Sequence, residues 1–342
     1  MQWYAALIVD KLIKLWKVNE RMIKIPNDDE EFDGVGVVKL PTFRVDESVT
    51  VATPKRLYAN AHAYHINSLS LNSDGETYIS ADDLRINLWN LEYEDQSFSK
   101  SVLTIDIVDI KPDSMEELTE VITAAEFHPI ECNLLMYSTS KGNIRLADMR
   151  TRALCDSSIQ GIQPLTIVFE DSTEDNNKTF FSEIISSISD IKFSKDGSQI
   201  ISRDYLTVKV WDPKMPNKPL SVFPVHDHLK PKLCDLYEND CLFDKFEVNV
   251  SYDSSFAISG SYSNYLQVFD IKGKTNPVFL HADKNAFKSK KPTKPKFIGR
   301  KKKDDFATNV DFSKKILHSS WHPEENSIAV AATNNLFIFS QL

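Results

Sequence analysis

The fold prediction rests on HINSLSLNSDGETYISADDLRINLWN, the stretch from His65 to Asn90. Short runs within it alternate apolar and polar residues, and Asp74-Gly75 separates two of these runs. Alternation with a period of two is typical of strands that bury one face, and Asp-Gly is typical of a tight turn between antiparallel strands. The stretch therefore predicts a small antiparallel sheet that ends on Trp89.

The same outline recurs along the chain. Further copies cover 124–148, 188–212, 246–270 and 318–339, and the tail of another covers 10–16. One such unit cannot bury both of its faces alone, whereas radially stacked units bury them against one another. The repeats predict an all-β WD-repeat β-propeller, a single domain over 1–342 with about five full blades and a partial first one.

Composition limits the function classes. The 342 residues carry a net charge of -9, with 49 acidic and 40 basic side chains, and 42% are hydrophobic. This supports a packed core, argues against binding nucleic acid over the whole surface, and fits a surface that attracts basic peptides. No apolar stretch is long enough to span a membrane. We expect a cytoplasmic protein, with the nucleus left open as a second compartment.

The cysteines and histidines give no sign of a metal site. Cys132, Cys155, Cys234 and Cys241 form no Cys-x-x-Cys pair, and the eight histidines are scattered. Such spacing fits neither zinc nor a disulfide scaffold, so buried free thiols in a reducing compartment are expected. No cofactor and no metal are predicted.

No catalytic motif stands out either. The pair Gly34 and Gly36 lacks the third glycine and the helix of a dinucleotide-binding fingerprint. Asp and His residues at the repeat turns are interpreted as structural, because their side chains bond the local backbone. This applies to Asp82, Asp83, Asp148, Asp204, His128 and His322. We predict that the chain is not an enzyme.

Long connections between the repeats offer sites for function. Residues 18–54 contain the acidic run Asp28–Glu31 and fit either a hairpin arm or a solvated loop. Residues 168–187 fit a surface excursion that returns to the core. The lysine-rich segment 283–305 fits a solvated loop better than a nucleic-acid or import-receptor site.

Residues 111–121 predict a short helix capped by Asp113 or Ser114, with acidic residues in its first turn. Met115 and Leu118 lie three residues apart and would share one face. Two interpretations stay open for this face. It packs onto the propeller, or it forms an exposed apolar and acidic docking surface.

Several longer strings resemble one known family. They are residues 62–68, 80–89, 115–129, 180–190, 236–241 and 314–318. Together they resemble the WD-repeat, fifty-five-kilodalton regulatory B subunits of protein phosphatase 2A, and the likeness extends from about Leu12 to the end of the chain. The resemblance implies a seven-bladed propeller that assembles with a helical-repeat scaffold (the A subunit) and with the serine/threonine phosphatase itself (the catalytic C subunit).

The resemblance also implies a role and a site. Family members recruit phosphoprotein substrates for dephosphorylation and carry no phosphatase chemistry themselves. Their acidic top face binds basic or helical substrate segments, and a hairpin arm, here 18–54, grips the scaffold. The matching docking positions are Tyr64, His65, Asp83, Met115, Glu116, Glu117, Leu118, Phe181, Ser182, Ile184, Glu238, Asp240 and Lys245.

Three departures from the family pattern bear on this expectation. The family's first blade and the start of its second are replaced by Met1–Val9, so an N-terminally truncated or divergent member is expected. The arm matches poorly over 19–41, and an extra stretch lies near 100–104. The alternatives are a generic WD-repeat interaction scaffold with other partners and an incomplete propeller fragment without function.

Overall fold

The computed structural model describes residues 3–9, 11–26, 43–58, 61–91, 105–112, 114–150, 167–169, 180–283 and 310–340. It divides into two compact units, Met1–Ile66 and Asn67–Leu342. Most of the segment 283–305, the acidic run Asp28–Glu31, Asp113 and Cys155 lie outside the described residues. The prediction of one domain over 1–342 stays a prediction.

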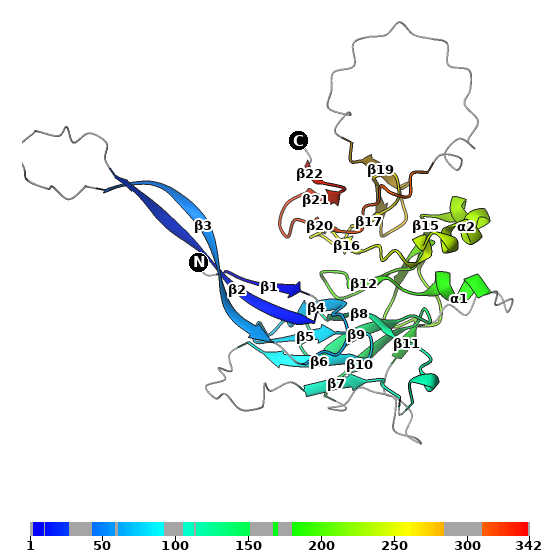
Figure 1. Cartoon of the computed structure of the whole chain (residues 1–342). Coiled ribbons are helices and arrows are strands. Elements are labelled where there is room, and N and C mark those ends of the chain that lie inside the picture. The colour runs from blue at the N-terminus through cyan, green and yellow to red at the C-terminus, as the bar shows by residue number, and fades with distance from the viewer. Residues whose placement is uncertain are drawn as a thin grey trace, which may run out of the picture. The chain divides into compact units, whose positions relative to one another are not determined.

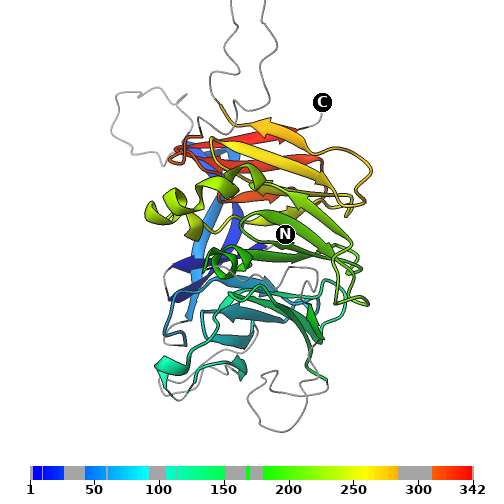
Figure 2. The same ribbon diagram turned by 90° about the vertical axis from the view of Figure 1, so that its right-hand side faces the viewer.

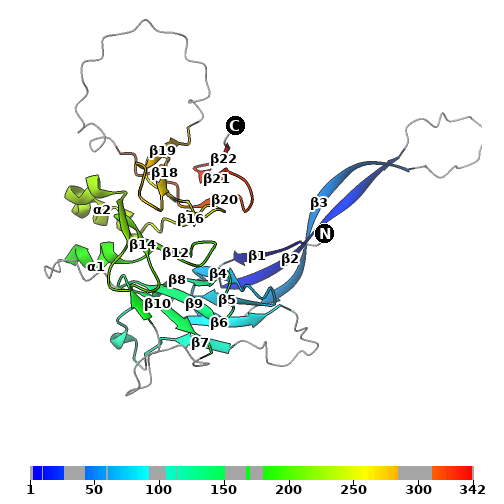
Figure 3. The ribbon, with the colours of Figure 1, turned by 180° about the vertical axis from the view of Figure 1, so that it is seen from behind.

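The first unit is a three-stranded antiparallel sheet. Its strands are β1 (Trp3–Val9), β2 (Leu12–Pro26) and β3 (Phe43–Tyr58), in the order β1-β2-β3. Strand β1 pairs with β2 only as far as Val18, so the rest of β2 pairs with β3 alone (Figure 3). The exposed side chains of Met22 and Val49 belong to this two-stranded part, within the range for which a hairpin arm was predicted.

The second unit contains five antiparallel sheets in the described residues, and each sheet follows the chain order of its strands. The first holds β4 (Ser68–Leu71), β5 (Thr77–Ala81), β6 (Arg85–Asn90) and β7 (Ile105–Asp109). The second holds β8 (Ile122–Phe127), β9 (Leu134–Thr139), β10 (Ile144–Asp148) and β11 (Ile167–Phe169). The third holds β12 (Asp190–Phe193), β13 (Ile200–Arg203), β14 (Thr207–Trp211) and β15 (Ser221–Pro224).

Two further sheets complete the second unit. The fourth sheet holds β16 (Val248–Val250), β17 (Phe256–Gly260), β18 (Tyr265–Asp270) and β19 (Val278–His281). The fifth holds β20 (Ser319–Trp321), β21 (Ser327–Ala332) and β22 (Asn335–Ser340). The five sheets coincide with the five full sequence copies, and Figures 1 and 2 show them stacked one after another.

Helices are short and lie in the connections. They are η1 (Met115–Glu117), α1 (Phe180–Ser186), η2 (Asp227–Lys232), α2 (Leu233–Glu238) and η3 (Cys241–Phe243). The all-β class predicted from the repeats is therefore confirmed, with helices only where the sequence inserts residues between strands.

Consecutive sheets share hydrophobic cores, which is what holds the stack together. Ile79 and Ile86 of the first sheet pack in one cluster with Phe127 and Leu135 of the second. Equivalent clusters join the second sheet to the third, the third to the fourth and the fourth to the fifth. The second, third and fourth sheets thus pack against a neighbour on both sides, as the sequence argument required, whereas Leu336 and Ile338 of the fifth sheet are exposed.

The first strands of neighbouring sheets are also joined by hydrogen bonds from side chains. Ser68 Oγ accepts from the backbone N–H of Ala125 at 2.9 Å, and Glu126 Oε2 accepts from that of Phe193 at 2.7 Å. Asp190 Oδ2 accepts from the N–H of Val248 at 2.9 Å. These bonds give backbone N–H groups of β8, β12 and β16 acceptors on the side where no strand pairs with them.

The turn residues act on the local backbone as expected. Asp82 Oδ1 accepts from the N–H groups of Leu84 and Arg85, and His128 Nδ1 accepts from those of Ile130 and Glu131. The structural interpretation of these turns is confirmed.

The expectation of buried free thiols needs a correction. Among the described cysteines Cys241 is buried, Cys132 is half-buried and Cys234 is exposed on α2. Cys234 lies on a short surface helix of an inserted connection, which the repeat pattern does not cover.

Candidate functional site

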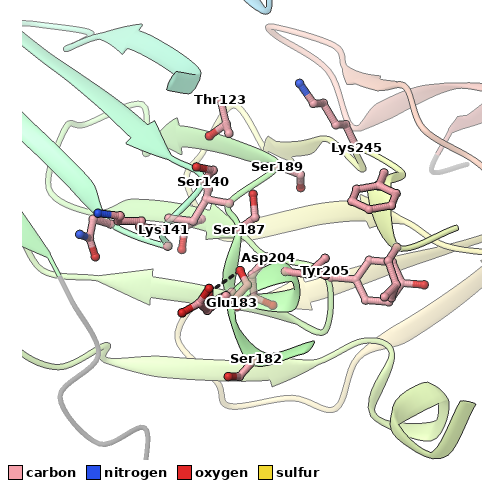
Figure 4. Close-up of a pocket in the computed structure, with 18 of the residues that line it drawn as sticks. Thr123, Ser140, Lys141, Ser182, Glu183, Ser187, Ser189, Asp204, Tyr205 and Lys245 are labelled. Carbon is pink, nitrogen blue, oxygen red and sulfur yellow. Dashed lines mark hydrogen bonds between the residues drawn. The ribbon is translucent and has the colours of Figure 1, made fainter. Parts of the chain in front are cut away.

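A pocket of about 810 Å³ opens in the second unit where three connections meet. Its lining includes Thr119, which follows the η1 segment, Ser182 and Ile184 from α1, and Lys245 from the link between η3 and β16 (Figure 4). The expected docking residues Ser182, Ile184 and Lys245 therefore line one hollow, together with Thr119, the residue that follows the expected docking positions Met115–Leu118.

Helices α1, α2 and η3 form a continuous surface beside this pocket, here called the helical platform. Phe180 and Phe181 contact Tyr237 of α2 through ring edges, with centroids 5.6 and 6.0 Å apart. Phe181 and Ile184 also pack against a buried cluster that includes Leu236. The rings thus fasten α1 to α2, and the apolar core below fixes both.

The acidic docking residues of the platform point to solvent. Glu238 is the last residue of α2, and Asp240 precedes η3 with a left-handed backbone, φ 56°. Both side chains are exposed. Their negative charge therefore lies next to the apolar side chains of the platform.

The η1 turn has a different setting. Ser114 is its N-cap, as one of the two predicted caps, and none of its residues is buried. Met115 is 50% exposed, while Leu118 is half-buried and Glu116 and Glu117 are exposed. For Met115 the interpretation as a packing residue is therefore wrong, because its side chain faces solvent.

A relay of polar groups joins Asp83 to Lys245. Asn67 Nδ2 donates to Asp83 Oδ1 at 2.9 Å and to the carbonyl oxygen of Ile122 at 3.1 Å. Lys245 Nζ donates to Asn67 Oδ1 at 3.3 Å. The Asp83 side chain thus makes a structural hydrogen bond, but to the side chain of Asn67 rather than to the backbone of its own turn.

Buried polar groups support the platform from below. The Nδ1–H of His226 donates to the carbonyl oxygen of Tyr205 at 2.8 Å, and Nε2 accepts from Ser261 Oγ at 2.9 Å. Burial, with the nearby Arg203 charge, holds the pKa of His226 well below its usual value. Burial also lowers the pKa of Arg203 to about 10. This histidine is neutral and acts as a fixed donor and acceptor.

Not every expected docking residue joins this site. Tyr64 and His65 are exposed, but they belong to the first unit. Sequence reasoning, in turn, missed Asn67 as a connecting residue and Lys141 as a pocket residue. Asn67 lies within a string that carried the family resemblance, whereas Lys141 had no signal beyond its place in a Ser-Lys-Gly turn.

Two other features are absent from the part of the chain that the structure describes. Among the described residues, no three His, Cys, Asp or Glu side chains are grouped so as to hold a metal ion. No helix in the same ranges is long and apolar enough to cross a membrane.

Comparison with known proteins decides the family. Residues 54–90 match the model of the WD domain, G-beta repeat. The chain is 50% identical to the regulatory B subunit of protein phosphatase PP2A from Schizosaccharomyces pombe, over 97% of this chain and 76% of that protein. It is 52% identical to the B beta isoform of the 55 kDa regulatory subunit of serine/threonine-protein phosphatase 2A from Carassius auratus, over 96% and 74%. The chain belongs to the family of PP2A regulatory B subunits.

A third member supports the same assignment. The PP2A 55 kDa regulatory subunit of Drosophila melanogaster is 51% identical over 96% of this chain and 66% of its own length. The resemblance, the WD-repeat fold and the regulatory, non-catalytic role expected from the sequence are thereby confirmed. The number of blades stays a prediction.

Proposed function

We propose that this regulatory protein assembles with the scaffold (A) and catalytic (C) subunits of protein phosphatase 2A and recruits phosphoprotein substrates to them. The observation that carries the proposal is the convergence of the segment after η1, helix α1 and Lys245 on one pocket. The exposed acids Glu116, Glu117, Glu238 and Asp240 border apolar side chains, which suits basic or helical segments of a substrate.

Recruitment works here by proximity. A docking contact holds the phosphorylated residue near the phosphatase and raises its effective concentration without any chemistry in the regulatory protein. Attraction between acidic docking residues and Lys or Arg of a substrate is electrostatic, so it weakens as salt shortens the Debye length.

Assembly is tested by co-expressing the chain with the scaffold and catalytic proteins and following size-exclusion chromatography. We expect the three proteins to elute together. A folded chain that elutes alone would refute the proposed assembly and would leave a WD-repeat scaffold with other partners.

Recruitment is tested with the assembled complex and the double substitution Glu116→Lys/Glu117→Lys. For a phosphopeptide flanked by lysines, we expect KM to rise several-fold at low salt while kcat is unchanged. The matched control is Glu324→Lys/Glu325→Lys, which alters an exposed adjacent pair between β20 and β21. An equal rise in KM in the control would mean that only net charge matters.

A further inference from the structure

The acidic side chains in the pocket wall are largely engaged in fixed interactions. Asp204 Oδ1 accepts from the N–H groups of Leu206 and Thr207, and its Oδ2 accepts from Thr207 Oγ1 at 2.6 Å. Lys209 Nζ lies 3.7 Å from the same carboxylate. The carboxylate is therefore neutralised and bonded before any ligand arrives.

Asp244 is engaged in the same way. Its Oδ2 accepts from the hydroxyl of Tyr262 at 3.0 Å, and its Oδ1 forms an ion pair with Lys315. Tyr262 is 2% exposed, and its hydroxyl oxygen also lies 2.9 Å from the carbonyl oxygen of Cys241, which shares the same hydrogen. These bonds fix the backbone at Asp244 and so position the next residue, Lys245.

The two exposed lysines of the lining have no such partner. Lys245 contacts only the neutral amide oxygen of Asn67 among the described residues, at 3.3 Å. Lys141 makes neither a hydrogen bond nor an ion pair through its side chain within the same ranges. Although the net charge of the protein is -9, two lysine side chains of the lining are thus available to a ligand. Glu183 is the one exposed acid among the described residues that line the pocket.

The wall between the lysines is rich in hydroxyl groups and tightly shaped. Thr119, Ser187 and Ser140 line the pocket, and Figure 4 shows Lys141 and Lys245 on opposite sides of it. Gly142 adopts φ +85°, and a Cβ there would lie 2.7 Å from the carbonyl oxygen of Ser186. The wall therefore leaves no room for a side chain at position 142, and its hydroxyl groups are donors that suit an anionic oxygen.

We propose that this pocket binds the oxyanion of an acidic side chain, a carboxylate or a phosphate ester, with Lys245 as its main cation. This inference rests on the proposed function and specifies the docking segment. The docking segment of the substrate then has two features. Its basic residues bind Glu116 and Glu117, and its acidic or phosphorylated residue binds in the pocket. Lys245 is favoured over Lys141 because Asn67 orients its ammonium group and Asp244 anchors its backbone.

The test uses the full chain and three probes: inorganic phosphate, O-phospho-L-serine and L-glutamate, each titrated calorimetrically at constant ionic strength. We expect saturable binding of at least one probe and about tenfold weaker binding in Lys245→Gln, since a charge-assisted hydrogen bond contributes on that order. The phosphate and carboxylate probes separate the two sources of the oxyanion. Lys214→Gln, which removes an exposed lysine after β14, is the matched control.

Each outcome decides the proposal. Absence of saturable binding, unchanged affinity in Lys245→Gln, or an equal loss in Lys214→Gln would overturn it. Melting temperatures of both variants establish that they fold like the parent chain. The titration needs no other protein, so its result does not depend on assembly. Failure to co-elute with the scaffold and the phosphatase would refute the proposed function without deciding whether the pocket binds an oxyanion.

Discussion

The helical platform and the η1 turn belong to the same expected docking surface, yet they are attached to the propeller in different ways. The platform stands on a core with buried Leu236 and Phe246, and its helices are joined by the ring of Tyr237. The η1 turn has no buried residue and depends on a cap from Ser114. Local shape in the platform is thus tied to the stability of the sheets below, whereas η1 contributes charge and an exposed methionine with little effect on folding.

Removing the core below the platform gives the largest expected effect. Leu236→Ala deletes a side chain that is 2% exposed, and we expect a loss of about 2–5 kcal/mol in the free energy of unfolding. Urea denaturation measures this loss. The contrasting change is Met115→Ala, for which we expect a difference within about 0.5 kcal/mol, as for other surface positions. Equal losses in the two variants would remove the distinction between the regions.

Buried His226, which packs below the platform, should make the free energy of unfolding depend on pH, and this sharpens the comparison. Because the folded-state pKa of His226 is depressed, the unfolded chain takes up a proton that the folded chain does not once the pH falls below about 6.5. The stabilising contribution is therefore complete above that pH and is lost as the pH falls, by up to about 1.4 kcal/mol per pH unit. Unfolding measured at several pH values should show this slope in the parent chain and a shallower one in His226→Gln.

That prediction has an internal control. His228 is exposed and has a smaller depression of its pKa, so His228→Gln should retain most of the slope. A slope unchanged in His226→Gln would mean that His226 is not its source. The buried carboxyl groups Glu126 and Asp190 do not produce it, because burial raises their pKa values and their protonation therefore favours the folded chain as the pH falls.

The smallest effect is expected at η1. Ser114 Oγ accepts from the N–H of Glu116 at 3.4 Å, a long bond on an exposed turn. Ser114→Ala should therefore change the free energy of unfolding by about 0.5 kcal/mol or less, at the lower end of N-cap effects. Amide exchange at Glu116 should nevertheless become faster, since its N–H loses its acceptor. A stability loss comparable to that of Leu236→Ala would show that η1 is part of the core.

Features that depend on residues close together in the sequence could be predicted, whereas features that depend on distant residues could not. The sheets were predictable because alternation and Asp or His turns are local, as Asp82 and His128 illustrate. The cap at Ser114 was local as well. The relay from Asp83 through Asn67 to Lys245 joins residues 178 positions apart, and no local pattern encodes that distance. The exposed state of Met115 likewise depends on neighbours that spacing alone does not reveal.

Side-chain bonds between the first strands of neighbouring sheets have a consequence for how the second unit unfolds. Ser68, Glu126 and Asp190 each bond the backbone of the following sheet, so detaching one sheet leaves polar groups of the next without partners. Coupling between nearest neighbours of this kind resembles a row of interacting elements, in which interior members are protected from both sides. Local opening should then begin at the sheets with one such neighbour and spread inward, and the sheets beneath the pocket would be among the last to open.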